Sequence, residues 1–276
     1  MGGITSLFEA GEAAVRAFKA GVDWLLMPPD FHRAYQAVLD AVRSGEISEK
    51  RLDESVYRVL SIKAKAGLHQ NERVDLENLE DLETLNHFSS RMSDTVCASA
   101  VTLIRNEDKT LPLSGMDKMA VFMLTDSDDD FYDDGYAFFQ EINSRSMNVE
   151  EFLSLNSDTK SSRMETAHRL IKKSDVVLFG LIIRVLPEKG TVELPPEFCQ
   201  LIDSAIHDGK TVVIISFGHP YVLRRFPNVH AFLCAYQYFH PMIASVVEVL
   251  FGERVPIGKL PVRIPTICER GTGLSF

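Results

Sequence analysis

The residues whose side chains could most readily bind a metal or take part in a reaction form an acidic run near the middle of the chain. Carboxylates recur at alternate positions from Asp126 to Asp130, and again at Asp133 and Asp134, as they do in calcium-binding loops. Phe131, however, occupies the position at which an EF-hand turn requires glycine, and no glutamate closes the loop at the required distance. The run also follows a predicted strand, as in phosphate-accepting receiver domains, but we find no matching lysine and threonine pattern. We therefore interpret it as a solvated acidic loop.

Three further residues with reactive side chains lie at or after the ends of predicted strands. Glu188 lies in a loop after the apolar strand 176–183, where a doubly wound sheet presents its loops to a ligand. A solvated surface loop is the alternative interpretation. His219 stands beside Pro220, and we interpret it as a turn residue. Ser216 lacks the glycine-flanked nucleophile elbow, so the sequence does not support serine-based hydrolysis.

The four cysteines, Cys97, Cys199, Cys234 and Cys268, are far apart in the sequence. None shows the short paired spacing of a zinc site. Cys97 and Cys199 fall in helical patterns and Cys234 falls in an apolar strand, which predicts buried free thiols. The sequence therefore predicts neither a disulfide framework nor a metal site.

The elements that would position a site begin with a helix, a strand and a stop signal. Apolar residues lie on one broad face of a predicted helix over 12–20, and Gly21 is placed for a left-handed C-terminal cap. Residues 22–27 form a nearly continuous apolar run, which is typical of a strand buried on both faces of a parallel sheet. Pro28 and the proline after it end this strand.

Two more helices are predicted after the strand. Apolar positions repeat at helical spacing over 35–42, and Asp30 is placed to cap this helix. Ser48 is placed to cap the next helix, which extends to Gly67. One strand among these helices cannot bury both of its faces, because a parallel strand needs neighbours on each side. We therefore expect partner strands from elsewhere, and exposed apolar flanks over 24–27 wherever those partners are missing.

A polar, acidic stretch at 69–87 breaks from the helical composition and is predicted to link two domains. Beyond it, over 88–276, apolar strands alternate with helices after a first helix at 86–99. This alternation predicts an α/β fold, an αβα sandwich with a mainly parallel sheet. The expected strands are 101–105, 119–124, 176–183, 212–216 and 231–235, and the expected helices between them are 138–142, 159–172, 196–207 and 241–251.

Composition excludes several classes of protein. The chain has 276 residues, of which 45% are hydrophobic and 25% charged, as expected for one large or two ordinary folded domains. Its formal charge of −10 disfavours a nucleic-acid partner, because phosphate binding needs a basic face. No apolar run is long enough to span a bilayer, and the first residues lack the pattern of a secretory signal. A neutral ligand such as a sugar is compatible with this composition, and the compartment stays open.

Motifs in both parts of the chain resemble one enzyme family. Residues 20–30, Ala-Gly-Val-Asp-Trp-Leu-Leu-Met-Pro-Pro-Asp, and the helical sequence at 45–60 resemble the barrel end of glycoside hydrolase family 3. The segments 101–106, 212–221 and 258–265 resemble the second domain of the same family. Together these matches extend over most of the chain. The resemblance implies that residues 1–68 form the incomplete C-terminal end of a TIM-like barrel, followed by the αβα sandwich.

Details of the second domain are most similar to the branch of the family that acts on β-N-acetylhexosaminides. This resemblance implies a retaining exo-glycosidase that releases terminal β-linked N-acetylglucosamine, or β-glucose as the second choice, without a metal or organic cofactor. The residues that carry the branch resemblance are Arg184-Val185, Lys189-Gly190, Leu194-Pro195, Phe217-Gly218 with Pro220-Tyr221, and the run from Gly271 to Leu274.

The same resemblance places the catalytic groups outside the sequence given. The nucleophilic aspartate of the family sits at the end of the seventh barrel strand, which corresponds to a position upstream of Met1. The acid/base histidine of the hexosaminidase branch, with its paired aspartate, lies on an earlier barrel loop that nothing in this sequence matches. We therefore assign no catalytic residue and expect the chain alone to be inactive. The implied partners are a carbohydrate substrate and the N-terminal barrel portion, in the same full-length chain or in a separate one.

Four residues are candidates for substrate binding. Active sites of barrels form at the C-terminal ends of the strands, which places Met1, Met27 and Pro28 at a pocket wall. A loop that only ends a strand is the alternative. Relatives with this second domain close one of its loops over the barrel site, which makes Glu188 the candidate for a contributed carboxylate. A function of a different class also stays open, namely a non-catalytic binding or docking module that complements a separately encoded barrel.

Overall fold

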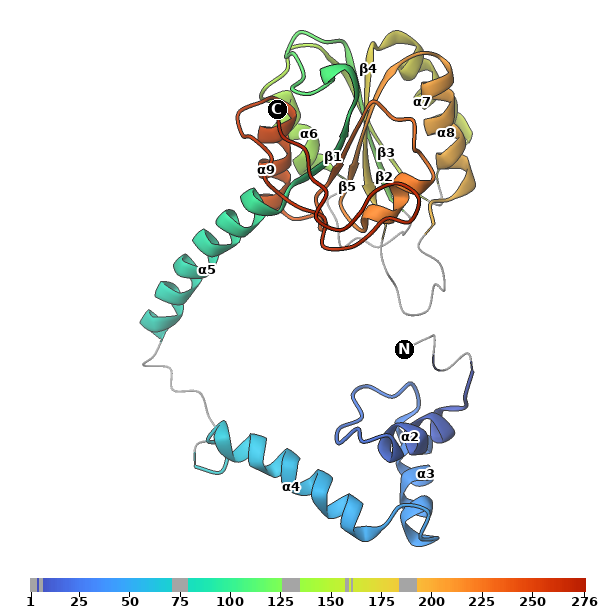
Figure 1. Ribbon diagram of the computed structural model, residues 1–276, viewed down its shortest axis with the longest axis vertical. Coiled ribbons are helices and arrows are strands. Elements are labelled where there is room, and N and C mark those ends of the chain that lie inside the picture. The colour runs from blue at the N-terminus through green and yellow to red at the C-terminus, as the bar shows by residue number, and fades with distance from the viewer. Residues whose placement is uncertain are drawn as a thin grey trace. The chain divides into compact units, whose positions relative to one another are not determined.

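The computed structural model describes residues 4, 7–70, 79–125, 135–156, 159, 161–183 and 193–276 (Figure 1). These residues form two compact units, one up to Leu82 and one from Glu83 onward. The division falls within the stretch 69–87 that we expect to link two domains, and the domain boundaries themselves stay a prediction. Within the described ranges, every helix is too short or too polar to span a membrane.

The described part of the first unit contains the helices α2 at Ala10–Lys19, α3 at Phe31–Arg43 and α4 at Glu49–Lys65. Helices α2 and α3 approach closely at Gly11, where there is no room for a larger residue. A β-carbon at this position would lie 2.9 Å from the Ala37 side chain. Their small core contains the buried residues Phe18, Ala41 and Ile47.

Sequence signals for the ends of these helices are confirmed. The Asp30 side chain accepts a hydrogen bond from Arg33 N at 3.0 Å at the start of α3. The Ser48 hydroxyl accepts one from Arg51 N at 3.2 Å at the start of α4. Gly21 follows α2 with a φ of 107°, a conformation that suits glycine. Each helix therefore begins or ends where a residue of the predicted type satisfies its terminal backbone groups.

The expected strand at 22–27 is absent from the structure. These residues form an irregular segment after α2, and Trp24, Leu26 and Met27 expose 58%, 81% and 85% of their surfaces. The reason is physical: the backbone N–H and C=O groups of a parallel strand need strands beside them, and the described part of the first unit supplies none. The prediction of a strand was wrong for this structure, whereas the expected exposure of its apolar flanks is confirmed.

A cluster of polar side chains holds the irregular segment to α4. The Asp23 carboxylate accepts hydrogen bonds from Ser55 Oγ at 2.7 Å, from Arg51 Nη1 at 3.0 Å and from Arg58 Nη1 at 2.9 and 3.1 Å. Arg51 also donates from Nη2 to the main-chain carbonyl of Val22 at 3.2 Å. The Ser55 hydrogen bond, with those from the two arginines, lowers the pKa of the Asp23 carboxyl, although burial opposes this shift.

The second unit begins within helix α5, which spans Leu79–Ala100 and starts earlier than the expected helix at 86–99. Its six-stranded sheet is built from β1 at Thr102–Asn106, β2 at Met119–Thr125, β3 at Val149–Leu155, β4 at Val176–Ile182, β5 at Thr211–Ser216 and β6 at Ala231–Cys234. The helices are α6 at Tyr136–Asn143, α7 at Ser161–Lys173, α8 at Pro196–His207 and α9 at His240–Leu250, with the short helices η2 at Glu107–Lys109 and η3 at Pro220–Arg224.

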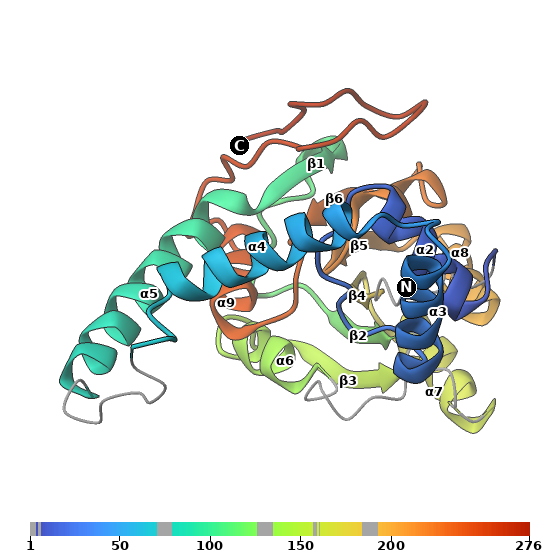
Figure 2. The ribbon, with the colours of Figure 1, turned by 90° about the horizontal axis from the view of Figure 1, so that it is seen from below.

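The strand order of the sheet is β1-β6-β5-β4-β2-β3, which Figure 2 shows from one edge to the other. Strand β1 pairs antiparallel with β6, and every other pair is parallel. Helices α7 and α8 cover one face of the sheet, and α6 and α9 cover the other (Figure 1). The predicted αβα sandwich with a mainly parallel sheet is therefore confirmed.

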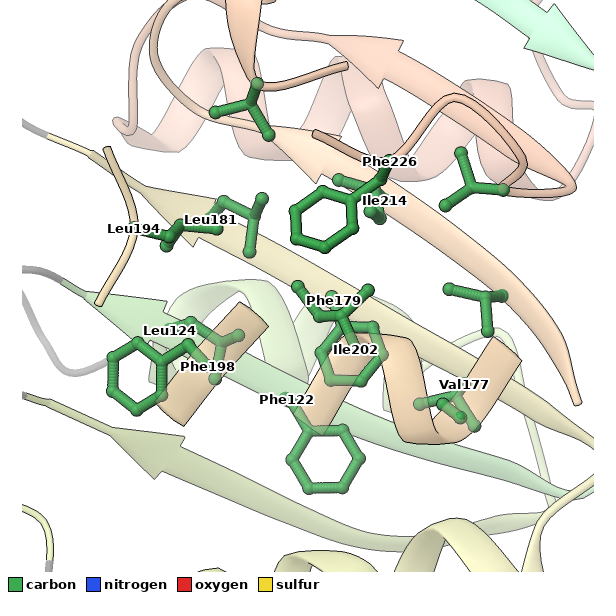
Figure 3. Close-up of a cluster of buried hydrophobic side chains, with 14 of the residues drawn as sticks. Phe122, Leu124, Val177, Phe179, Leu181, Leu194, Phe198, Ile202, Ile214 and Phe226 are labelled. Carbon is green, nitrogen blue, oxygen red and sulfur yellow. The ribbon is translucent and has the colours of Figure 1, made fainter. Parts of the chain in front are cut away.

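Alternation along the strands divides the apolar side chains between two cores, one on each face of the sheet. Figure 3 shows the core on the α8 side, where Phe198 and Ile202 of α8 lie over the sheet. Beneath them, Phe122 of β2 and Phe179 of β4 are fully buried, and their rings stack with centroids 5.2 Å apart. These rings fill the middle of the core on this face of the sheet.

The two edges of the sheet differ. Strand β3, which the sequence did not predict, pairs only with β2 among the described strands, and it carries the charged residues Glu150 and Glu151. The sequence of β3 shows only a weak pattern of apolar residues, because only the last residues of the strand are well buried. At the opposite edge, the C-terminal part of the chain lies against β1, where Leu274 N donates to the Leu103 carbonyl at 2.7 Å.

We expect Phe179→Ala to lower the free energy of unfolding of the sandwich by about 3–5 kcal/mol, the usual cost of removing a buried phenylalanine. Urea unfolding followed by far-UV circular dichroism measures this loss. Met147→Ala is the matched control, because Met147 is 89% exposed and its truncation leaves no cavity. An equal, small effect of both substitutions would show that the Phe122–Phe179 stack is not a packed core.

Acid should weaken the first unit through Asp23. A carboxyl whose pKa is lowered by folding stabilises the folded state above its unfolded pKa, about 3.9, and this contribution is lost as the pH falls through the lowered folded value. Trp24 is the single tryptophan of the sequence, so its fluorescence reports unfolding of this unit. In urea we expect the midpoint of wild type to fall between pH 5 and about pH 3 more than that of Asp23→Asn. Parallel pH profiles for the two proteins would contradict this account.

Candidate functional site

The structure describes two of the four candidate substrate-binding residues. Met27 and Pro28 lie at the end of the irregular segment, and Met27 is exposed with a φ of 47°. Positive φ is uncommon for methionine, so this turn is locally constrained. Met1 and Glu188 lie outside the described residues, as does the acidic run 126–134. Whether the four candidates come together therefore stays a prediction.

A hollow of about 560 Å³ lies between the irregular segment, α3 and α4. Pro28 lines it together with three exposed aromatic side chains, Trp24, Phe31 and Tyr35. The rings of Phe31 and Tyr35 stack with centroids 6.1 Å apart. Flat apolar faces of this kind pack against the ring of a sugar or against an apolar protein surface.

The charges around this hollow do not form a hydrolytic pair. Its charged lining residues are Asp23 and Lys63. Retaining hydrolysis of a glycoside needs two carboxyl groups flanking the bond, and the Asp23 carboxylate is already bound by Ser55 and two arginines. The described lining therefore offers a surface for binding rather than an acid/base pair.

A second hollow of about 630 Å³ lies on the sandwich between the start of α8 and η3. Arg225 on its rim is paired with Asp203 of α8 through Nη1 to Oδ1 at 3.3 Å and through Nη2 to Oδ2. Cys199 also lines the hollow, and burial raises the pKa of its thiol, so the sulfur stays protonated at neutral pH. Neither side chain is prepared for nucleophilic chemistry.

The turn after β5 shows how two predicted residues are used. Ser216 Oγ donates to the main-chain carbonyl of His219 at 2.8 Å, so the hydroxyl closes the turn rather than acting as an activated nucleophile. His219 has an extended backbone, with φ −83° and ψ 151°, and directly precedes η3, so it lies after the bend at 217–218 rather than within it. Gly218 lets this turn approach the end of β4, because a side chain there would lie 2.9 Å from the carbonyl oxygen of Ile183.

All four cysteines are free thiols. Cys97 and Cys234 are buried as predicted, and burial raises the pKa of Cys234 to about 12. The same prediction was wrong for Cys199, which is half-buried because it lies beside the second hollow. Cys268, in the C-terminal loops, is also half-buried. In the described ranges no three His, Cys, Asp or Glu side chains gather to hold a metal ion.

Tyr236 is a residue whose role the sequence did not indicate. It follows β6 with a φ of 66°, and its hydroxyl lies 2.9 Å from Thr102 Oγ1 on β1. Thr102 donates to the carbonyl of Ala100 at 2.8 Å, so the phenol of Tyr236 is the donor between the two hydroxyls. Burial raises the pKa of Tyr236 to about 12, which keeps this proton in place at neutral pH. The residue ties the end of β6 to β1.

Similar proteins are known both in sequence and in fold. The chain is 24% identical over 276 residues to a beta-N-acetylglucosaminidase/beta-glucosidase of Cellulomonas fimi, a match that covers 95% of this chain and 47% of the relative. It is 25% identical over 296 residues to a lysosomal beta glucosidase of Dictyostelium discoideum, covering 93% of this chain and 35% of the relative. The chain thus spans about half or less of the length of these curated relatives.

In fold, the chain is similar to the solved structure of a beta-glucoside phosphorylase, BglX, bound to 2FGlc. The TM-score is 0.70 at 21% identity, and the match covers 92% of this chain and 46% of that one. The model of the glycosyl hydrolase family 3 C-terminal domain matches residues 101–271, and the model of the N-terminal domain of the same family matches residues 1–62. The chain therefore belongs to glycoside hydrolase family 3, a family of glycosidases.

Proposed function

We propose that the chain is the C-terminal part of a retaining exo-glycosidase that hydrolyses O-glycosyl bonds and releases terminal β-linked N-acetylglucosamine. β-Glucoside hydrolysis is the second choice of substrate. The Cellulomonas fimi relative carries both activities in its name and supports this pair. The motifs within 184–195 and 271–274 favour N-acetylglucosamine. The reaction needs two carboxyl or equivalent groups of the protein and no metal or organic cofactor.

The observation that carries the proposal is the exposed apolar segment at 22–27. Its composition is that of a strand buried on both faces, yet Trp24, Leu26 and Met27 lie largely in solvent. Strands of a barrel would supply the missing neighbours. We therefore propose that an N-terminal barrel portion, in the same full-length chain or encoded separately, pairs with this segment. The chain alone would then be inactive, because the nucleophile and the acid/base would belong to that portion.

Completion of the barrel would also complete the sugar pocket. Met27 and Pro28, at the end of the segment, would form part of its apolar wall, with Met1 beside them at the end of the preceding strand. Glu188, which follows β4 in the sequence, would contribute a carboxylate. The domain organisation in this proposal is 1–68 for the barrel end, 69–87 for the linker and 88–276 for the sandwich.

A non-catalytic docking module that complements a separately encoded barrel is the alternative from another class. The same exposed segment favours it, because either arrangement uses residues 22–27 as the pairing surface. The two differ in what this chain adds to a barrel. A catalytic completion raises turnover, whereas a docking module binds the barrel without changing its turnover.

Mixing the purified chain with a separately expressed barrel portion of a close relative should restore hydrolysis of a chromogenic β-N-acetylglucosaminide. A β-glucoside is assayed in parallel, and each component alone should be silent. Leu26→Asp should lower the restored activity by roughly 100-fold or more, because pairing would bury an uncompensated carboxylate. Leu26 is 81% exposed in the chain itself, so this substitution leaves the two units folded.

Met147→Asp is the matched control, since it introduces the same charge at an exposed apolar residue of the sandwich, 89% exposed. Its complementation should equal that of wild type. Activity of the chain by itself would mean that its catalytic groups lie within these residues. Equal activity of Leu26→Asp and wild type on mixing would remove segment 22–27 as the pairing surface, and binding without a gain in turnover would favour the docking module.

A further inference from the structure

Asp23 makes most of the polar contacts that hold the segment at 22–27 in place. The backbone N–H of Val22 donates a hydrogen bond to the carbonyl of Ala17 at 3.1 Å. No backbone–backbone hydrogen bond joins residues 23–28 to another residue that the structure describes. The Asp23 carboxylate, with bonds to Ser55, Arg51 and Arg58, therefore holds the segment in the way that a strand ladder would otherwise hold it.

The groups that bind Asp23 come from one face of α4. Arg51, Ser55 and Arg58 are spaced at i, i+4 and i+7, so their side chains share one side of the helix. Arg51 reaches further: its Nη2 donates to the carbonyls of Phe18 at 3.3 Å and Val22 at 3.2 Å, and its guanidinium lies 4.7 Å from the centre of the Phe18 ring. The cluster thus joins the end of α2, the segment and α4 at a single point.

Exposure alternates over residues 22–26, and Met27 after them is exposed like Leu26. Asp23 and Leu25 are half-buried, whereas Val22, Trp24 and Leu26 are exposed. A period of two is that of an extended strand, whose successive side chains point to opposite faces, and a shift by one residue exchanges those faces. The Asp23 tether therefore selects the side of the segment that turns toward α4 and the side that is left for partner strands.

We propose that Asp23 is a positioning residue of the glycosidase site. By fixing residues 22–27 to α4, it sets the face and register with which they add to barrel strands, and through them the place of Met27 and Pro28. In the extended strand that this proposal requires, Met27 would lie roughly 13 Å beyond Asp23, at about 3.3 Å per residue, so Asp23 would act through the segment and not on the substrate. The inference rests on the proposed function.

Removing the negative charge of Asp23 should disturb the placement of the segment more than the loss of one hydrogen bond would. Asp23 is the carboxylate between Arg51 and Arg58, and Asp23→Asn keeps its shape but leaves two guanidinium groups facing an uncharged amide. Repulsion between these cations would then favour other placements of the segment. Arg58→Gln is the milder variant, because Arg51 and Ser55 still bind the carboxylate.

The test uses the whole chain in the complementation assay. The barrel portion is titrated to saturation, and kcat and KM are measured there for the β-N-acetylglucosaminide. Asp23→Asn should lower kcat/KM at saturation by about 10- to 100-fold, the effect of a small misplacement of pocket residues, and Arg58→Gln should lower it less. Asp203→Asn is the control, because it removes a carboxylate paired with an arginine in the sandwich, Arg225, and should change nothing.

A second measurement follows the segment in the free chain. Trp24 is the single tryptophan of the sequence, so its fluorescence anisotropy reports the mobility of the segment directly. Anisotropy should fall in Asp23→Asn and, by less, in Arg58→Gln, and it should stay at the wild-type value in Asp203→Asn. Unchanged far-UV circular dichroism shows that the helices of the variants are intact.

The outcomes separate the inference from the function on which it rests. Activity of wild type on mixing, with an equal kcat/KM for Asp23→Asn at saturation, overturns the positioning role and leaves the proposed function standing. The positioning role is likewise overturned if only the half-saturating concentration of the barrel portion rises. No activity of wild type on mixing overturns the proposed function, and unchanged Trp24 anisotropy in Asp23→Asn then overturns the tether as well.

Discussion

Pairing of backbone N–H and C=O groups between neighbouring strands is the constraint on which the rest of this structure depends. In the sandwich, β2, β4 and β5 each have a strand on both sides and a layer of helices over both faces, so their apolar side chains are buried and their backbone groups are paired. Residues 22–27 have the same kind of composition but no strand beside them in the described part of the first unit, and they remain irregular. The need to pair backbone groups thus explains both the regular sheet of the sandwich and the irregular, exposed segment of the first unit.

Much of the fold could be predicted from local signals. Caps such as Asp30 and Ser48 act within one turn of chain, and fully buried strands such as β4 are marked by their composition alone. Strand β3 escaped prediction because an edge strand with exposed glutamates carries little apolar signal. The strand at 22–27 was predicted wrongly for a different reason: hydropathy records that a segment needs neighbours, and it does not record whether the chain provides them.

The candidate site was less accessible to sequence reasoning than the fold. Met27 and Pro28 follow from a rule about barrel strands, but the role of Asp23 depends on partners on α4, and a single aspartate within an apolar run gives no spacing to interpret. The partners do carry a signal, since Arg51, Ser55 and Arg58 repeat at helical spacing on one face. Such a row of donors on one face of a helix indicates an acceptor nearby. Tyr236 offers no comparable signal, because its hydrogen bond to Thr102 joins residues far apart in sequence.

The edges of the sheet bear on how this chain associates with other proteins. One edge is covered by the chain's own C-terminal part, where Leu274 is bonded to Leu103 of β1, and the other, β3, carries glutamates that repel an incoming strand. Both devices discourage edge-to-edge aggregation. The segment at 22–27 lacks both kinds of protection. It is mainly apolar, and among the described residues its backbone makes no backbone–backbone hydrogen bond beyond Val22. Among the described residues, the segment at 22–27 is therefore less protected against an added strand than either edge of the sandwich sheet.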